Sequence, residues 1–163
     1  MQFELTKEFI DDVIEAIDLG KNDHIKKIIN PLHPADIAEI LNIVNLPQAQ
    51  FIFRLLNEDL ASEVLVEIEE DTREKFLTSL STEEIAESLD KMYADDATDV
   101  IQDLPEDVQE EVLEALTDDE LQSVISQLLN YDEDSAGGIM DMDFISANWN
   151  WTVENALKKF REQ

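Results

Sequence analysis

Residues 33–68 read HPADIAEILNIV, NLPQAQFIFRLL and NEDLASEVLVEI, which are three consecutive blocks of twelve residues. The same rhythm continues to residue 128, so that residues 33–128 divide into eight blocks. Every block ends in an apolar residue, and the ninth position is apolar in all of them. Positions five, eight, nine and twelve follow the spacing of three and four residues that is typical of the buried face of an amphipathic helix.

The residue types at the block starts indicate where each helix begins. Proline, serine, threonine, asparagine and acidic residues stand there, and these are the types favoured at helix N-termini. Each block therefore predicts one short helix of about nine residues followed by a tight turn. Because a helix this short is marginal alone, we expect the helices to bury their apolar faces against one another. The predicted fold is all-α, a solenoid-like superhelix of short antiparallel helices.

The regions on either side of the blocks have a different character. Residues 22–32 join the rhythm, and the preceding segment predicts a longer amphipathic helix that ends at Gly20. After Leu129 the rhythm stops, and a polar stretch leads into a segment rich in β-branched and aromatic residues, which favours a strand. A last helix follows. We therefore predict one domain over residues 1–131 and the truncated beginning of a second over residues 132–163.

The net charge is the unusual property of the composition. The chain has 11 basic and 40 acidic residues, for a formal charge of −29. Such a surface repels nucleic acids and anionic lipids and attracts cations or basic proteins. There are no cysteines, which excludes thiolate metal sites, and no apolar run approaches the roughly 18–20 residues of a membrane span. We expect a soluble, cytoplasmic piece of protein with no bound nucleic acid.

The acidic residues occur at regular positions within the blocks. Position three is acidic in six consecutive blocks: Asp59, Asp71, Glu83, Asp95, Asp107 and Asp119. In the same six blocks, position seven adds four further acids: Glu63, Glu87, Asp99 and Glu111. The helix dipole explains an acid in the first turn but not one at position seven. Two interpretations remain open, namely a solvated acidic face and a weak, water-rich site for a divalent cation.

An enzymatic role has little support in the sequence. There is no glycine-rich phosphate loop, no HExxH motif and no nucleophile elbow. Both histidines, His24 and His33, lie near the N-terminus, and we expect structural or surface roles for them. Catalysis would depend on carboxylates alone, so we predict that the chain is not an enzyme.

Three stretches together resemble a known family. HPADIAEIL (33–41), DEDSAGGIM (132–140) and WTVENAL (151–157) are similar to the cytoplasmic region of MgtE-type magnesium transporters and channels. In that family a superhelical N-terminal domain precedes a pair of CBS domains, a connecting helix and a membrane pore. The resemblance covers essentially the whole chain. It implies that residues 132–163 are a linker and the start of the first CBS domain, built from a strand and a helix.

The resemblance also implies a function. In the family, cytoplasmic Mg2+ binds between the N-terminal domain and the CBS domains and controls gating of the pore. The implied partners are the chain's own CBS domains and pore domain and, in the full-length protein, a second copy in a homodimer. By motif, the implied metal ligands are Asp95, Asp99, the backbone of Gly138 and, through the internal 36-residue match, Glu63. Because the CBS carboxylates would lie beyond Gln163, we expect binding weaker than millimolar.

A second hypothesis comes from the helical repeats themselves. Superhelices of short helices commonly bind a protein partner along one face, and an acidic face selects a basic partner. The chain would then be an acidic α-helical-repeat interaction module. Retention of one basic partner irrespective of Mg2+ would favour this hypothesis over Mg2+ sensing.

Overall fold

The computed structural model describes residues 5–132, 135–140, 142 and 146–162. Within these ranges the chain forms helices, turns and irregular segments, and no strand. The helices are α1 (Lys7–Asp18), α2 (Asn22–Ile29), α3 (Pro34–Ile43), α4 (Leu46–Phe53), α5 (Glu58–Glu67), α6 (Glu70–Leu77), α7 (Thr82–Leu89), α8 (Ala94–Gln102), α9 (Glu106–Ala115), α10 (Asp119–Leu128) and α11 (Val153–Glu162). No helix among them combines the length and the apolar character that crossing a membrane requires.

The twelve-residue rhythm determines where the helices begin. Helices α3 to α9 each start at the second residue of a block, so the first residue is the N-cap. The Asn57 side chain, for example, accepts a hydrogen bond from the Leu60 N–H at 2.9 Å. Asn45 and Ser81 form reciprocal capping boxes with the residue three positions later. These local contacts satisfy N–H groups that would otherwise have no partner in the helix.

The longer first helix has a cap at each end. Thr6 Oγ1 accepts a hydrogen bond from the Phe9 N–H at 3.2 Å. At the other end Gly20 has a φ of 63°, a backbone conformation that glycine adopts without steric penalty. The N–H groups of Gly20 and the following residue donate to the carbonyls of Ile17 and Ala16, both at 2.9 Å. This is the Schellman pattern, and it confirms the predicted end of the helix at Gly20.

The predicted apolar stripe forms the core. Most ninth-position residues are buried, as Leu65, Leu77 and Ile101 illustrate. The stripe contains a polar exception at Ser88, which is 5% exposed. Its hydroxyl donates to the Glu84 carbonyl one turn earlier at 3.1 Å, so burial leaves no hydroxyl donor unpaired. A single core therefore extends through the helical blocks.

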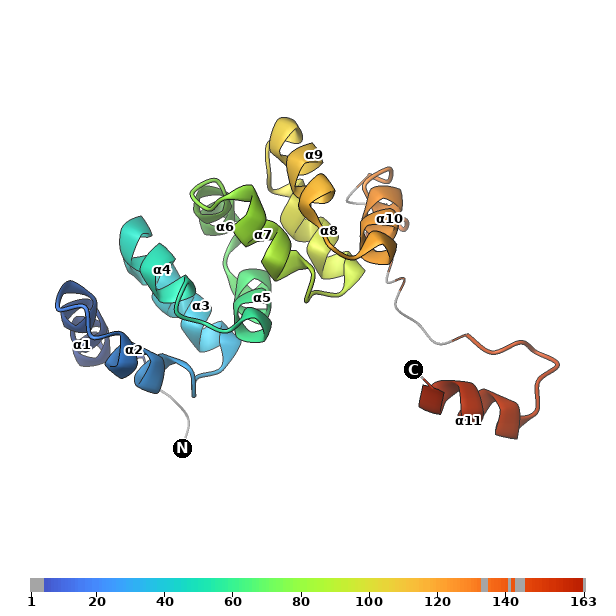
Figure 1. Ribbon diagram of the computed structural model, residues 1–163, viewed down its shortest axis with the longest axis horizontal. Coiled ribbons are helices and arrows are strands. Elements are labelled where there is room, and N and C mark those ends of the chain that lie inside the picture. Colours follow the sequence, from blue (N-terminus) through green and yellow to red (C-terminus); the bar gives the residue numbers. More distant parts are fainter. Residues whose placement is uncertain (1–4, 133–134, 141, 143–145, 163) are drawn as a thin grey trace.

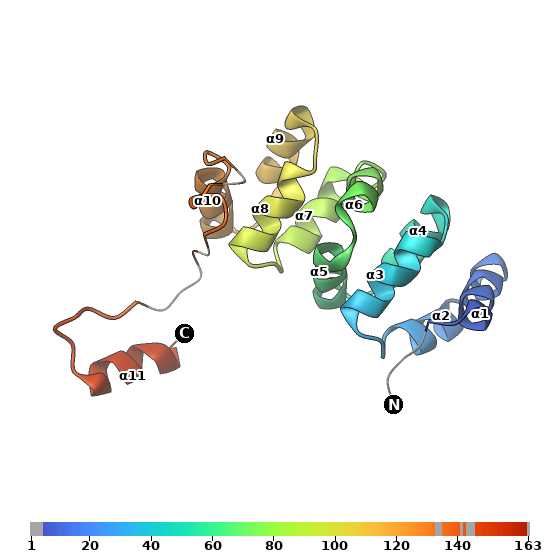
Figure 2. The ribbon, with the colours of Figure 1, turned by 180° about the vertical axis from the view of Figure 1, so that it is seen from behind.

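The helices stack into a curved two-row superhelix, which Figures 1 and 2 show from opposite sides. Helices two apart in sequence pack most closely: α3, α5, α7 and α9 form one row. On the other row α4 contacts α6, and α8 contacts α10. Blocks three apart match in sequence without gaps, whereas the packing repeats every two blocks. The predicted all-α superhelix is confirmed.

The glycine pair lies in the turn that follows α10. Residues 136–139 form this turn, closed by a hydrogen bond of 3.1 Å from the Ile139 N–H to the Ser135 carbonyl. A Cβ at Gly137 would stand 2.3 Å from the Tyr131 ring. A side chain at 137 would therefore displace the Tyr131 ring, and no positive φ calls for glycine at this position.

Helix α11 lies apart from the superhelix in both views (Figures 1 and 2). Its predicted N-cap is confirmed, since Thr152 Oγ1 accepts from the Asn155 N–H at 3.3 Å. The predicted strand over 139–151 falls partly on residues 141 and 143–145, which lie outside the described ranges. The described residues of that segment form turns and irregular structure. A strand is stable only when it pairs with a neighbouring strand. That residues 132–163 begin a CBS domain remains a prediction.

Candidate functional site

Two rows of carboxylates run along helices in the middle of the superhelix. The α8 row consists of Asp95, Asp99 and the C-cap residue Asp103. The α5 row consists of Asp59, Glu63 and Glu67. Members of each row are four residues apart, so they share one edge of their helix. The two rows are related by the internal match, because each member of one lies 36 positions from its counterpart in the other.

Asp99, in the middle of the α8 row, has a perturbed acidity. The residue as a whole is exposed, but the surrounding protein partly desolvates its carboxyl, and this desolvation raises the pKa above the ordinary value. The guanidinium of Arg73 opposes this rise, and the carboxylates of Asp95 and Asp103 add to it. The folded chain therefore holds this proton to a higher pH than the unfolded chain does. The contribution of Asp99 to stability is present below both pKa values and is lost as the pH rises through the folded-state pKa.

The inner end of the α8 row is occupied by an arginine that the sequence analysis missed. Arg73 Nε donates to Asp103 Oδ2 at 2.5 Å, and Arg73 Nη1 donates to the Val66 carbonyl at 3.3 Å. Both side chains of the ion pair are only 13% exposed. A signal for this pair was available, since Arg73 stands at position five, which faces the core and holds an apolar residue in most other blocks.

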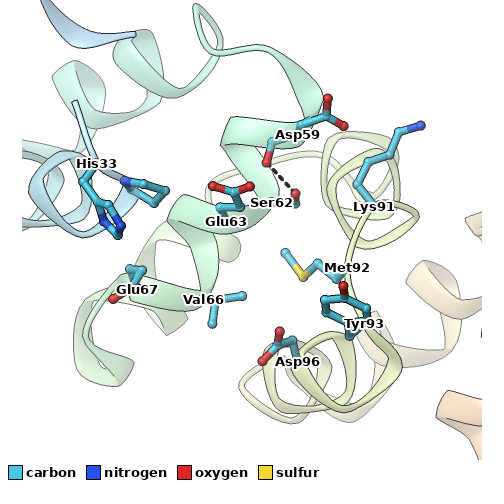
Figure 3. A pocket seen from close by; sticks show the side chains of 11 residues that line it. His33, Asp59, Ser62, Glu63, Val66, Glu67, Lys91, Met92, Tyr93 and Asp96 are labelled. Carbon is cyan, nitrogen blue, oxygen red and sulfur yellow. Dashed lines mark hydrogen bonds between the residues drawn. The ribbon is translucent and has the colours of Figure 1, made fainter. Parts of the chain in front are cut away.

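The α5 row forms one wall of a groove of about 570 Å³ (Figure 3). Asp59 and Glu63 lie on α5, and Asp96 lines the opposite side. The groove also contains basic side chains, including that of Lys91. Lys91 Nζ also approaches a carboxylate oxygen of Glu58 at 3.6 Å. Four acidic side chains line the groove, so it retains an excess of negative charge.

The structure brings some of the predicted ligands together and leaves others separate. The Asp95 carboxylate contributes to the raised pKa of Asp99, in keeping with their spacing of four residues on one helix. Glu63 lies in the groove, across from Asp96. Gly138 belongs to the turn after α10, where its N–H donates to the Ser135 hydroxyl at 3.1 Å. Within the described part of the chain, no three acidic or histidine side chains converge as a ready metal cage.

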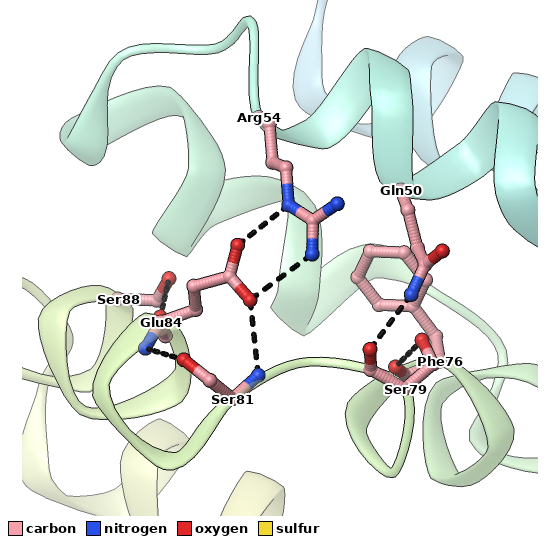
Figure 4. A network of polar contacts seen from close by, with 7 residues as sticks. All are labelled: Gln50, Arg54, Phe76, Ser79, Ser81, Glu84 and Ser88. Atoms are coloured by element: carbon pink, nitrogen blue, oxygen red, sulfur yellow. Dashed lines mark hydrogen bonds and ion pairs between the residues drawn. The ribbon is translucent and has the colours of Figure 1, made fainter.

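A separate polar network fixes α7 against α4 (Figure 4). Arg54 donates to both carboxylate oxygens of Glu84, at 2.6 and 3.3 Å. Glu84 also accepts from the Ser81 N–H at 2.9 Å, and hydrogen bonds from Arg54 and Ser81 lower its pKa. Because the Arg54 side chain is 53% exposed, we expect this pair to add little stability. It resembles the Arg73 pair in chemistry and differs from it in burial.

Comparison with known proteins identifies the domain. Residues 32–134 match the model of the MgtE intracellular N domain. The chain belongs to this family. The resemblance expected from the sequence is thereby confirmed, as is the location inside the cell that the family's description gives. The MgtE N domain match covers all eight blocks.

Two solved structures share the fold. One is described as the soluble part of a magnesium transporter: it is 23% identical, with a TM-score of 0.77 over 96% of this chain and 61% of its own. The other is described as the cytosolic domain of the Mg2+ channel MgtE in complex with ATP: it is 24% identical, with a TM-score of 0.80 over 94% of this chain and 62% of its own. The chain thus spans about three fifths of each. No curated protein matches it.

Proposed function

We propose that this MgtE N domain is the cytoplasmic Mg2+-sensing regulatory domain of a magnesium transporter or channel. The observation that carries the proposal is the carboxylate pair of Asp95 and Asp99. Partial desolvation makes the ionised form of Asp99 less favourable than in water, and the neighbouring carboxylates add repulsion. A divalent cation bound at this edge of α8 would relieve both effects. The net charge of −29 adds a general attraction for cations.

Mg2+ suits an incomplete site of this kind. It keeps several of its waters and commonly uses only one or two protein carboxylates. Asp95 and Asp99 would supply these, with Glu63 and the Gly138 carbonyl contributing as the domain closes on its partner. In our proposal the remaining ligands come from the chain's own CBS domains, so that Mg2+ holds the two domains together and restrains the pore. A homodimer of the full-length protein would contain two such Mg2+-bridged interfaces.

Helix α11 supports the proposed second domain over residues 132–163. Its apolar residues Val153, Leu157 and Phe160 are 77%, 49% and 62% exposed. They recur at spacings of four and three residues and so lie on one face of the helix. Such a face is typical of a helix that packs on another element of its own domain.

The first test compares Mg2+ with Na+ in thermal unfolding of the 163-residue chain. About 10 mM MgCl2 should stabilise it by roughly 1 kcal/mol, or about 2–4 °C, beyond about 30 mM NaCl, which has the same ionic strength. The reason is that a cation that binds only the folded state shifts the equilibrium toward it. Equal stabilisation by the two salts would reduce the effect to screening and remove the sensing proposal.

The second test removes the carboxylate pair. The double variant Asp95→Ala, Asp99→Ala should fold as the parent does or be slightly more stable, because repulsion and a partly desolvated charge are lost. Its Mg2+-specific gain in melting temperature should disappear. The matched control is Asp107→Ala, Glu111→Ala, which changes the same two block positions on α9, where both residues are exposed. A control that loses the same Mg2+ response would contradict the assignment.

The groove on α5 favours a second candidate function. Its carboxylates and the exposed ring of Tyr93, 69% accessible, suit a basic peptide. The chain would then be an interaction module rather than a sensor. Binding of a basic partner that is unaffected by Mg2+ and is lost on replacement of Glu63 and Glu67 would support this candidate over the first.

A further inference from the structure

The buried ion pair at the inner end of the α8 row bears on how that row binds cations. We infer that Arg73 is a built-in cation that permanently occupies the third carboxylate, Asp103, and so confines divalent binding to Asp95 and Asp99. The inference rests on the proposed function, because it assigns a control on the same site.

The position of Arg73 is unusual for an arginine. It stands at the fifth position of its block, where the blocks on either side have Ala61 and Ile85, both buried. Its guanidinium is consequently drawn into the protein, where it contacts the Asp103 carboxylate at 2.5 Å and the Val66 carbonyl at 3.3 Å. An arginine side chain does not lose its proton in a protein. The guanidinium is therefore a fixed positive charge in this place.

The α5 row has the same spacing of carboxylates as the α8 row but no arginine beside it. The residue 36 positions before Arg73 is Ile37, which is fully buried. The α5 row, whose third member is the exposed Glu67, therefore has no arginine in the corresponding place. Of the two rows, the α8 row alone combines three carboxylates with an internal positive charge, and it also holds the carboxylate pair that carries the proposed function.

The charges of the α8 row match one divalent cation. Three carboxylates and one guanidinium leave a net charge of −2, which a single Mg2+ neutralises. Removal of the guanidinium would leave −3 and free Asp103 as an additional ligand. Loss of the Asp103 charge would instead leave −1 and direct the guanidinium toward Asp99, whose ionised form Arg73 already stabilises. The two changes should therefore move the affinity for divalent cations in opposite directions.

The test measures thermal unfolding of the 163-residue chain across a MgCl2 titration, with ionic strength held constant by NaCl. Arg73→Gln should be less stable than the parent in NaCl, and Mg2+ should recover much of the loss. In Arg73→Gln, the Mg2+ concentration that gives half of the maximal increase in melting temperature should fall about tenfold, because an extra carboxylate faces the ion. Asp103→Asn should raise that concentration about tenfold for the opposite reason.

Two controls separate this inference from a purely structural role. The double variant Arg73→Gln, Asp103→Asn restores the net charge of −2 and should return the Mg2+ concentration to the parental value. Arg54→Gln removes an arginine from the exposed pair on α4 and should leave that concentration unchanged. A purely structural pair would lower stability in the variants without shifting their Mg2+ dependence. If Arg73→Gln does not fold, the inference is decided by Asp103→Asn alone, which should raise the Mg2+ concentration required for stabilisation.

The outcomes for the parent and the variants are distinguishable. If the parent responds to Mg2+ and neither single variant shifts the concentration required, the inference is overturned and the proposed function stands. If the parent does not respond but Arg73→Gln gains a Mg2+-specific response, the proposed function fails, and the inference is overturned as stated, because Arg73 would then exclude divalent cations from the whole row rather than confine them to Asp95 and Asp99. If no form of the chain responds to Mg2+ beyond NaCl, both are overturned.

Discussion

Replacement of Phe76 by alanine should lower the free energy of unfolding by about 3–5 kcal/mol. Phe76 lies on α6 and is 1% exposed. Its ring meets that of Phe53 edge to face, with centroids 5.1 Å apart and planes at 75°. Alanine would therefore remove both buried apolar surface and an aromatic contact between α6 and α4. Urea denaturation followed by circular dichroism measures the loss as a lower midpoint with a similar slope.

The chain provides a matched control for this change. Phe160 on α11 is 62% exposed, so Phe160→Ala should alter the free energy of unfolding by no more than about 0.5 kcal/mol. Phe76→Leu, which keeps most of the buried volume, should fall between the two. A loss at Phe160 equal to that at Phe76 would mean that α11 packs on a core of comparable tightness.

Asp90→Ala should be the most destabilising change at a polar position outside the α8 row, at about 2–3 kcal/mol. Asp90 is the C-cap of α7, and its carboxylate binds the turn before α10. It accepts from the Thr117 N–H at 3.1 and 3.2 Å, from the Thr117 hydroxyl at 2.6 Å and from the Asp118 N–H at 3.4 Å. Alanine would leave these donors without their partner, and hydrogen bonds to a charged group are among the stronger ones.

Two variants define the contribution of this contact. Asp90→Asn retains one acceptor oxygen and should lose about half as much stability as alanine does. Thr117→Ala removes only the hydroxyl donor, so its effect should also be smaller than that of Asp90→Ala. Urea midpoints for the three variants provide the comparison. An Asp90→Asn variant as unstable as Asp90→Ala would assign the effect to charge rather than to hydrogen bonds.

The helices themselves could be predicted closely from the sequence because their signals are local. The apolar stripe and the capping residue both lie within the twelve residues that they organise. Even the exception has a local cause: α10 begins one residue later in its block than the others do. The reason is that Asp118, the second residue of the block, is its N-cap and accepts from the N–H groups of Glu120 and Leu121.

The packing and the polar contacts between helices could not be predicted in the same way. Which helices meet depends on how the whole stack curves, and blocks three apart resemble each other although helices two apart pack together. Arg73 illustrates the difficulty, because its partner Asp103 is 30 residues away. An arginine at position five, where most blocks have an apolar residue, is recognisable as unusual from the sequence. The sequence near Arg73 does not indicate which distant residue its guanidinium contacts.

The candidate site shows the same difference between local and long-range relations. Asp95 and Asp99 could be paired from the sequence, since an interval of four residues places two side chains on one edge of any helix. Glu63 and Gly138 lie on other elements, and their relation to the pair depends on how those elements come together. Their assignment as ligands therefore still rests on the family resemblance and on the proposal.

The long-range polar contacts overlap along the stack. Arg54 reaches Glu84, Arg73 reaches Asp103, and Asp90 reaches Thr117, each across 27–30 residues of sequence. The stretch of sequence that each contact spans overlaps the stretch spanned by the next. The exposed Arg54 pair adds little, whereas the buried Arg73–Asp103 pair and the hydrogen bonds to Asp90 should resist bending between α6 and α10. A cation bound on α8 should then shift α6 to α10 as one unit rather than move α8 alone.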